Sequence, residues 1–263
     1  MLVDCHAHLA SKRFDADRDA VRRRAKEAGV GVVLVVGEDF EDSQRVLEVT
    51  AEPCDGGTEL VPCVGLHPDR FAEDREPPGR REVEAIADLV RERREEIAAI
   101  GEVGLDRHWV KSEARRAAQA AFLEEMAALA VEVDLPLNVH SRAAGHYAID
   151  LLLASGAPKV LMHAFDGKVA YAVKGAEAGF LFSIPPSAVR SEQKQAMIRK
   201  LPLESLALES DAPVLGPVRT ERNEPANLTL TLDLMAEMHG VSKERVAEVT
   251  TANAKRLFPR LGQ

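Results

Sequence analysis

Short apolar runs recur along the chain, and most are followed by a charged stretch with helical spacing. Each run is apolar nearly throughout, as expected of strands that are covered on both faces. The pattern predicts eight strands, at residues 2–5, 31–36, 60–65, 98–103, 135–139, 160–163, 180–184 and 206–209.

The stretches between these runs carry apolar residues at helical spacing. They predict helices at residues 15–29, 81–96, 113–133, 146–154, 168–178, 191–200, 227–239 and 243–258. Gly29 is a plausible C-terminal cap, and Gly240 and Ser242 mark a helix stop and an N-cap. The loop 69–79, rich in proline at its ends, is expected to be a surface insertion.

Strands that alternate with helices indicate parallel βαβ units. Eight such units favour a closed barrel over an open doubly wound sheet, and no glycine-rich phosphate loop follows the first strand. The 263 residues are close to the roughly 250 typical of that barrel. We therefore expect the α/β class, with a single (β/α)8 TIM barrel of the metallo-dependent hydrolase type over residues 1–263.

Charge and cysteine content limit the partners and the cellular compartment that we expect. The formal net charge of −9 argues against a protein that grips nucleic acid or an anionic membrane by bulk positive charge. A small basic or metal-loaded site stays open. Cys5, Cys54 and Cys63 form no CxxC pair, which favours a reducing compartment. Without an apparent signal peptide or a run of 18 apolar residues, we expect a cytoplasmic protein with no membrane contact.

Polar residues gather where the predicted strands end, which is where barrel enzymes carry their active sites. Five of the eight histidines lie there. His6 and His8 are two positions apart, so an extended strand points both to one face. Alone, such a pair could also be a surface turn with two titratable histidines. The strand-end set that would converge in a barrel is His6, His8, Glu102, His140, His163 and Asp211.

These nitrogen and oxygen donors suit two divalent ions with positions left open for water, and they do not select among Mg, Mn, Zn and Fe. Each residue has another interpretation. Glu102 could pair with an arginine, His140 and His163 could be satisfied core histidines, and Asp211 could cap a helix. Cys5 has the opposite strand parity to its neighbours and is expected to be packing.

One layer deeper, three residues share the parity of the candidate ligands. Asp4 would lie below His6, Asn138 below His140, and Glu209 below Asp211. Hydrogen bonds that orient the ligands and plain burial with backbone partners are equally open for them.

Motifs along nearly the whole chain resemble the TatD family of metal-dependent hydrolases. The matching segments, in order, are VDCHAHL, GLHP, GEVGLD, LPLNVHSRAAG, MHAFDG, LESDAP, RNEP and TTANAKRLF. The FSIPPS stretch and the LGP before RNEP look closest to one animal subgroup of that family. The chain departs from the family's pattern at Ala10, His146 and Ser210, which leaves the ligands intact and puts substrate preference in doubt.

The resemblance implies a metal-dependent deoxyribonuclease, often a 3′-to-5′ exonuclease, on a TIM barrel. It implies ligand roles for the six residues of the strand-end set and substrate contacts for His67 and Arg142. A structural Nδ1-to-backbone bond is an open alternative for His67, and a surface ion pair is one for Arg142. Arg222 and Asn223 of RNEP are expected either to hold a phosphate or to close the barrel rim.

The mechanism that follows is hydrolysis of DNA by a metal-activated water between two ions. Glu102 would bridge the ions, and Asp211 would be ligand and general base together. We expect a monomer acting on single-stranded DNA or 3′ ends, with a weak and salt-sensitive grip.

Two rival functions stay open. The first is an amidohydrolase or esterase on the same barrel, for instance one resembling a D-aminoacyl-tRNA deacylase. Strand four carries Glu102 and no lysine within residues 98–106, which disfavours the subtype with a carboxylated lysine. The second is a non-catalytic binding protein that retains a metal site.

Overall fold

Strands pair in sequence order, each parallel to the next, in the computed structural model, which describes residues 1–262. The eight strands are β1 Leu2–Ala7, β2 Val30–Val36, β3 Glu59–Val64, β4 Ala99–Gly104, β5 Leu137–His140, β6 Val160–Met162, β7 Leu181–Ile184 and β8 Leu206–Leu208. The ends of β8 and β1 are joined because Asp211 N–H donates to the His6 carbonyl at 2.9 Å, and His8 N–H donates to the Ala212 carbonyl at 2.7 Å. The predicted (β/α)8 barrel is confirmed.

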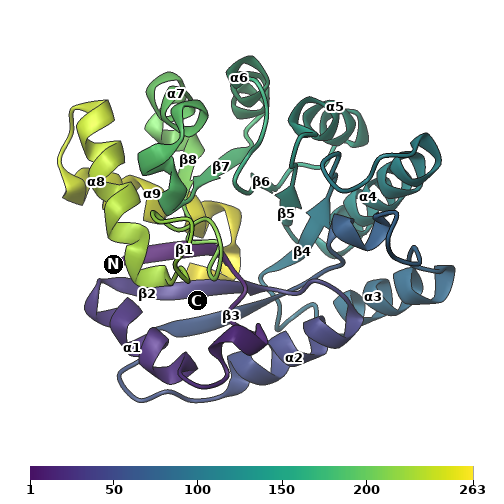
Figure 1. Cartoon of the computed structure of the whole chain (residues 1–263), viewed down its shortest axis with the longest axis horizontal. Helices are drawn as coiled ribbons and strands as arrows, with labels where there is room; N and C mark the ends of the chain where they lie inside the picture. The colour runs from purple at the N-terminus through teal and green to yellow at the C-terminus, as the bar shows by residue number, and fades with distance from the viewer. Residues whose placement is uncertain (263) are drawn as a thin grey trace.

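Helices surround the strands (Figure 1). They are α1 Arg18–Glu27, α2 Phe40–Ala51, α3 Arg80–Glu92, α4 Glu113–Val133, α5 Gly145–Ser155, α6 Val169–Glu177, α7 Glu192–Lys200, α8 Leu228–His239 and α9 Lys243–Leu257. Short 3₁₀ turns are η1 Lys12–Phe14, η2 Pro68–Phe71, η3 Pro186–Arg190, η4 Leu203–Ser205, η5 Pro225–Asn227 and η6 Pro259–Gly262. Within residues 1–262, none of these helices combines the length and the apolar character that a bilayer crossing needs.

The sequence pattern predicts no helix between the second and third strands, and this expectation is wrong. Helix α2 lies there, and the side chain of its N-cap, Asp39, accepts a hydrogen bond from the Asp42 N–H at 2.9 Å. Val46 and Val49 are buried on one face of the helix. Both signals are visible in the sequence, but acidic residues dilute the apolar stripe.

The predicted helix boundary near the C-terminus is confirmed. Gly240 ends α8 with φ of 64°, a left-handed conformation that glycine adopts at little cost. The Ser242 side chain begins α9 by accepting from the Arg245 N–H at 3.1 Å. The segment 69–79 is less of a surface insertion than expected, since Phe71 is buried at its start.

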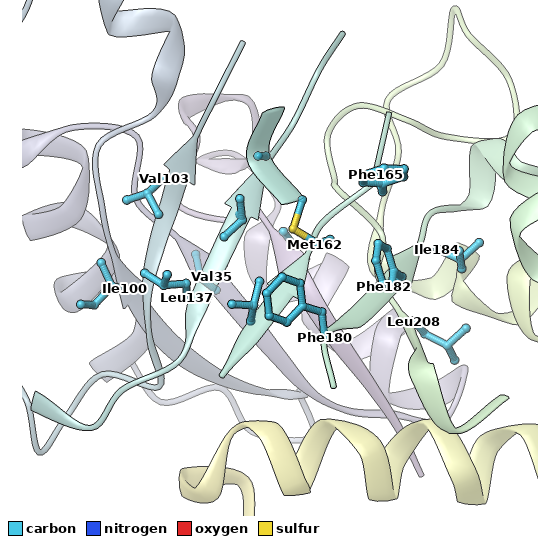
Figure 2. Close-up of a cluster of buried hydrophobic side chains, with 14 of the residues drawn as sticks. Val35, Ile100, Val103, Leu137, Met162, Phe165, Phe180, Phe182, Ile184 and Leu208 are labelled. Atoms are coloured by element: carbon cyan, nitrogen blue, oxygen red, sulfur yellow. The ribbon is translucent and has the colours of Figure 1, made fainter. Parts of the chain in front are cut away.

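Hydrophobic side chains fill two layers, because successive residues of each strand point to opposite faces. Val33 and Val35 of β2 belong to the cluster between strands and helices, part of which Figure 2 shows. Val32 and Leu34 belong to a second cluster on the inner face, together with Phe258. Cys5 is fully buried in this second cluster, so it is packing, as expected, but it lies on the inner face and does not point away from its histidine neighbours, because the register of β1 shifts between Asp4 and Ala7. The floor of the barrel is thus apolar, and polar side chains are concentrated at the carboxyl ends of the strands.

Candidate metal centre

A cavity of about 690 Å³ opens at the carboxyl ends of the strands. Its walls include five residues of the predicted strand-end set, and the sixth, His6, is fully buried directly behind them. The structure therefore brings together all the residues that the sequence singles out as ligands: His6, His8, Glu102, His140, His163 and Asp211.

Glu102 is the centre of the group. Its side chain is 1% exposed, and its Oε2 lies 3.4 Å from both His6 Nε2 and His8 Nε2. Its Oε1 lies 2.8 Å from His140 Nδ1 and 3.3 Å from His163 Nε2. Within residues 1–262, Glu102 pairs with histidines and not with an arginine. The structural salt bridge that the sequence left open for it is therefore not what the structure shows.

Asn138 fixes the orientation of the His6 ring. Its Nδ2 donates to the Cys5 carbonyl at 2.9 Å, so its Oδ1 is the atom that faces His6 Nδ1, also at 2.9 Å. A carbonyl oxygen can only accept, and the neutral His6 ring therefore carries its proton on Nδ1. The lone pair on Nε2 then points toward Glu102 and Asp211.

Two more histidines are held in the same way. His163 Nδ1 lies 3.2 Å from Glu209 Oε2, which also accepts from Ser183 Oγ at 2.6 Å. His140 Nε2 lies 3.0 Å from Asp106 Oδ2. When these rings are neutral, each carboxylate can accept the N–H of the far nitrogen, which leaves the lone pair of the near nitrogen toward Glu102. An acceptor behind each ring is the usual support of metal-ligating histidines.

The deeper layer contains the predicted residues, but their partners differ from those expected. Asn138 orients His6 and not His140, and Glu209 holds His163 and not Asp211. Asp4 contacts no ring, because its Oδ1 accepts from the His6 and Ser210 backbone N–H groups at 3.2 and 2.8 Å. Asp4 thereby ties β1 to the segment after β8, and burial raises the pKa of its carboxyl to about 8.

The cluster attracts positive charge. Burial alone would lower the pKa of His8, but the hydrogen bond to Asp211 and the charge of Glu102 raise it to about 9. Burial would likewise raise the pKa of Glu102, yet His67, His6 and His163 hold it well below its usual range. A field that favours a proton on these rings favours a metal cation in the same place.

A divalent cation fits the geometry and the chemistry of the donors. His6 Nε2, His8 Nε2 and Asp211 Oδ1 lie within 3.6 Å of one another, all of them acceptors when the rings are neutral. Glu102 Oε2 is buried beside them and has no hydrogen-bond partner among residues 1–262. A buried carboxylate oxygen without a partner is costly, and a cation removes that cost. Imidazole and carboxylate ligands suit zinc, manganese or iron.

The backbone brings Asp211 into the group at a cost in strain. Its φ is 54°, in the left-handed region that non-glycine residues avoid by about 1–3 kcal/mol. The bond from its N–H to the His6 carbonyl holds it there. Asp211 caps no helix, and its side chain is 7% exposed and faces the histidines.

His67 makes the Nδ1-to-backbone contact that the sequence left open, and its other ring nitrogen lies on the cavity wall. The Asp69 backbone N–H donates to His67 Nδ1 at 3.0 Å, and His67 Nε2 lies 3.3 Å from Glu102 Oε1 on the cavity wall. Because Nδ1 accepts, the neutral ring carries its proton on Nε2. His67 is thus a hydrogen-bond donor directed into the cavity.

Arg142 and Arg222 differ in their position relative to the cavity. Arg142 is exposed on the cavity wall and has no ion-pair partner within residues 1–262. Arg222 lies outside the cavity lining, and this corrects the expectation that it contacts substrate. Its guanidinium binds both oxygens of Asp17, at 2.7 and 2.6 Å, and thereby joins the segment after β8 to the region before α1. Closing the rim is the role that the geometry supports.

Asp106, Trp109 and Lys194 are among the residues of the cavity wall that were not singled out from the sequence. Asp106 stands in the GEVGLD motif at a strand end, so a signal existed for it. Lys194 had none, since it lies among charged residues at the start of a helix. Its Nζ donates to the Ala164 and Phe165 carbonyls at 2.7 and 2.5 Å, and burial lowers its pKa to about 8.

The three departures from the family pattern, Ala10, His146 and Ser210, lie outside the cavity lining. Ala10 is buried in the outer hydrophobic cluster, and His146 packs on Tyr147 with ring centroids 3.7 Å apart. Ser210 Oγ accepts from the Ala212 N–H at 3.2 Å. None of the three replaces a residue of the His–Glu–Asp group.

A TIM barrel whose strand ends carry a buried carboxylate among histidines defines the class of metal-dependent hydrolases. The sequence matches the TatD related DNase family over residues 3–259. The chain belongs to the TatD family.

Two relatives and one solved structure illustrate the similarity. The chain is 40% identical to deoxyribonuclease TATDN3 of Homo sapiens, with 99% of this chain and 95% of that protein covered. It is 33% identical to the uncharacterized metal-dependent hydrolase YabD of Bacillus subtilis, over 98% and 99% of the two chains. The crystal structure of the TatD homologue YjjV from Escherichia coli superposes with a TM-score of 0.87 and 27% identity, over 98% of each chain.

Proposed function

We propose that this protein is a deoxyribonuclease that hydrolyses phosphodiester bonds with two divalent cations. The observation that carries the proposal is the arrangement around Glu102: near nitrogens of three histidines face its oxygens, and an acceptor holds the far nitrogen of each ring. The name of the human relative, a deoxyribonuclease, supports the choice of substrate.

Three overlapping groups of donors support more than one ion: His6, His8 and Asp211; His6, Glu102 and His163; and His67, Glu102 and His140. His6, His8 and Asp211 would hold one cation together with Glu102 Oε2. His140 and His163 would hold the other together with Glu102 Oε1. Bound divalent cations supply Lewis acidity, which stabilises charge on a phosphoryl oxygen and lowers the pKa of water.

The chain's own residues supply the proton transfers. Although burial raises it, the pKa of Asp211 is lowered by the hydrogen bond from His8 and by the other histidines, so its carboxylate is ionised at neutral pH. It can accept a proton from the attacking water as general base. His67 Nε2–H, which lies 3.3 Å from Glu102 Oε1, would donate to a phosphoryl oxygen bound there, and the free Arg142 fork would bind a second one.

The mouth of the cavity favours a polyanionic substrate. Four exposed arginines line it, Arg13, Arg142, Arg190 and Arg219, against two exposed carboxylates, Glu38 and Asp166, while Glu102, Asp106 and Asp211 lie buried. This gives the acidic chain a local positive rim. The cavity has the size of a pocket for a nucleotide-sized ligand, which supports recognition of a few nucleotides at a single-stranded 3′ end.

The test is hydrolysis of a 5′-labelled single-stranded oligonucleotide with added Mn²⁺ or Mg²⁺. We expect stepwise shortening from the 3′ end, and its loss in His6→Ala and Asp211→Ala. His239→Ala, at the end of α8 and outside the cavity lining, is the matched control and should keep full activity. Shortening at the full rate in both site variants would refute the assignment. Deacylation of a D-aminoacyl-tRNA without cleavage of DNA would establish the rival esterase.

A further inference from the structure

The chain's single tryptophan stands half exposed on the cavity wall, next to the metal centre. Trp109 lies in the turn that follows β4, and 52% of its surface is exposed. An exposed indole leaves a large apolar area in water and adds little to the core. Nothing in the proposed chemistry at Glu102 and Asp211 uses Trp109.

The turn that carries Trp109 is fixed relative to the metal centre through one carboxylate. Asp106 Oδ1 accepts from the His108 and Trp109 backbone N–H groups at 2.6 and 2.7 Å. Its other oxygen, Oδ2, lies 3.0 Å from His140 Nε2. The next residue, Val110, is fully buried. The backbone that carries the indole is therefore held in place before any ligand arrives, which lowers the entropic cost of binding to it.

Positive charge accompanies the aromatic surface. The Arg142 guanidinium lies over the Trp109 ring at 5.6 Å from its centroid, too far for a tight stack, so the fork stays available to a phosphate. Arg107 lies over the Tyr147 ring at 3.0 Å, and its backbone N–H donates to the Arg142 carbonyl at 3.0 Å. Two arginine–aromatic pairs thus adjoin, and one of them, Arg142 with Trp109, lines the cavity.

We propose that Trp109 is the platform on which an unpaired nucleobase of the substrate stacks. The adjoining phosphate then lies at the His–Glu–Asp group, and Arg142 binds the phosphate of the stacked nucleotide. This rests on the proposed function and specifies its substrate. A flat aromatic ring beside a phosphate-binding arginine is the chemistry that binds single-stranded nucleic acid, because every base has a π face. The platform selects for an unstacked base and is tolerant of which base it is.

Intrinsic fluorescence tests the contact directly, because Trp109 is the only tryptophan of the chain. The probes are a thymidine tetranucleotide and an oligomer of equal length built from abasic tetrahydrofuran residues, mixed with the metal-loaded protein in a stopped-flow instrument. We expect quenching by the thymidine oligomer before hydrolysis and little by the abasic one. Equal quenching, or none with either, would overturn the proposal.

Kinetics provide the second readout. Trp109→Ala should raise KM for the thymidine oligomer by about tenfold, as expected for loss of one base stack, and change kcat by less than about twofold. Trp109→Phe keeps a planar ring and should recover most of the loss. Val131→Ala, an exposed apolar position on α4 outside the cavity lining, is the matched control and should match the unmodified protein.

The abasic oligomer separates this proposal from the proposed function. The unmodified protein should hydrolyse the abasic oligomer slowly, and Trp109→Ala should not change that rate. If DNA is cleaved but Trp109→Ala acts equally on both oligomers, the platform is refuted and the nuclease stands. If no oligomer is cleaved with any metal, the nuclease is refuted, and the difference in quenching still decides whether a base stacks on Trp109.

Discussion

Glu209 Oε2 lies 3.2 Å from His163 Nδ1, and this contact decides which nitrogen of the ring faces Glu102. Ser183 Oγ donates to the same oxygen at 2.6 Å and holds the carboxylate in place. The pair is buried, with side chains 5% and 0% exposed. When the His163 ring is neutral, its contact with Glu209 therefore leaves the lone pair on the nitrogen that faces the cavity. Glu209 itself is not one of the candidate ligands.

Glu209→Gln should weaken metal binding without unfolding the barrel. The amide can turn its NH₂ toward His163 Nδ1, which would move the ring proton to Nε2 and hide the lone pair. We expect about a 10- to 100-fold loss of affinity, measured as a Mn²⁺ titration by calorimetry. Glu204→Gln, beyond the cavity lining near the start of β8, is the control. Unchanged affinity in Glu209→Gln would mean that this contact does not set the tautomer.

Arg142 and Arg222 have different surroundings, so replacing the first should affect substrate binding and replacing the second should affect stability. Arg142→Ala should raise KM for DNA about tenfold and leave the melting temperature unchanged, because its fork is unpaired and faces the cavity mouth. Arg222→Ala should leave KM unchanged and cost about 0.5–1 kcal/mol of stability, since its ion pair with Asp17 is partly exposed. Steady-state kinetics and thermal unfolding of both variants check this. The reverse pattern would return Arg222 to the substrate site.

Lys194 should make stability depend on pH in the alkaline range. Its pKa is lowered to about 8 by burial, against 10.5 for an ordinary lysine. Between these values the unfolded chain binds more protons than the folded one, so this residue's contribution to stability rises with pH, by up to about 1.4 kcal/mol per pH unit. Below pH 8 Lys194 is protonated in both the folded and the unfolded state, and burial of its charge destabilises the fold by the full amount.

Urea unfolding of the unmodified protein and of Lys194→Met, in EDTA, measures that contribution as a difference. Met has no titrating group, so the stability of the unmodified protein relative to Lys194→Met should increase from pH 8 to pH 10. A difference that stays flat over this range would show that Lys194 has an ordinary pKa in the fold.

Much of the barrel was predictable because its strands are short, apolar and separated by helical stretches. The ligand group was predictable for a related reason: residues such as His6 and Asp211 stand at strand ends, which meet at one mouth of a closed barrel. Helix α2 was missed because acidic residues interrupt its apolar stripe. The pattern of the chain is informative where burial is continuous and weak where a helix is mostly exposed.

Partners across the barrel were not predictable from parity alone. Asn138 shares the strand of His140 but reaches His6, 132 positions away, because the register between strands decides which side chains meet. The same holds for Arg222, whose partner Asp17 is 205 positions away in sequence. Strand parity gives the face of a side chain, and only the assembled barrel gives its neighbour.

The central claim is that Glu102 and the five donors around it hold two divalent ions. Anomalous scattering from crystals grown with Mn²⁺ tests it most directly, with Glu102→Ala crystals as the control. The account predicts two peaks, one beside His6, His8 and Asp211 and one beside His140 and His163, with the Glu102 carboxylate between them and both peaks lost or weakened in the variant. A single peak would contradict the two-ion centre, and the absence of any peak in this cluster would contradict the metal site itself.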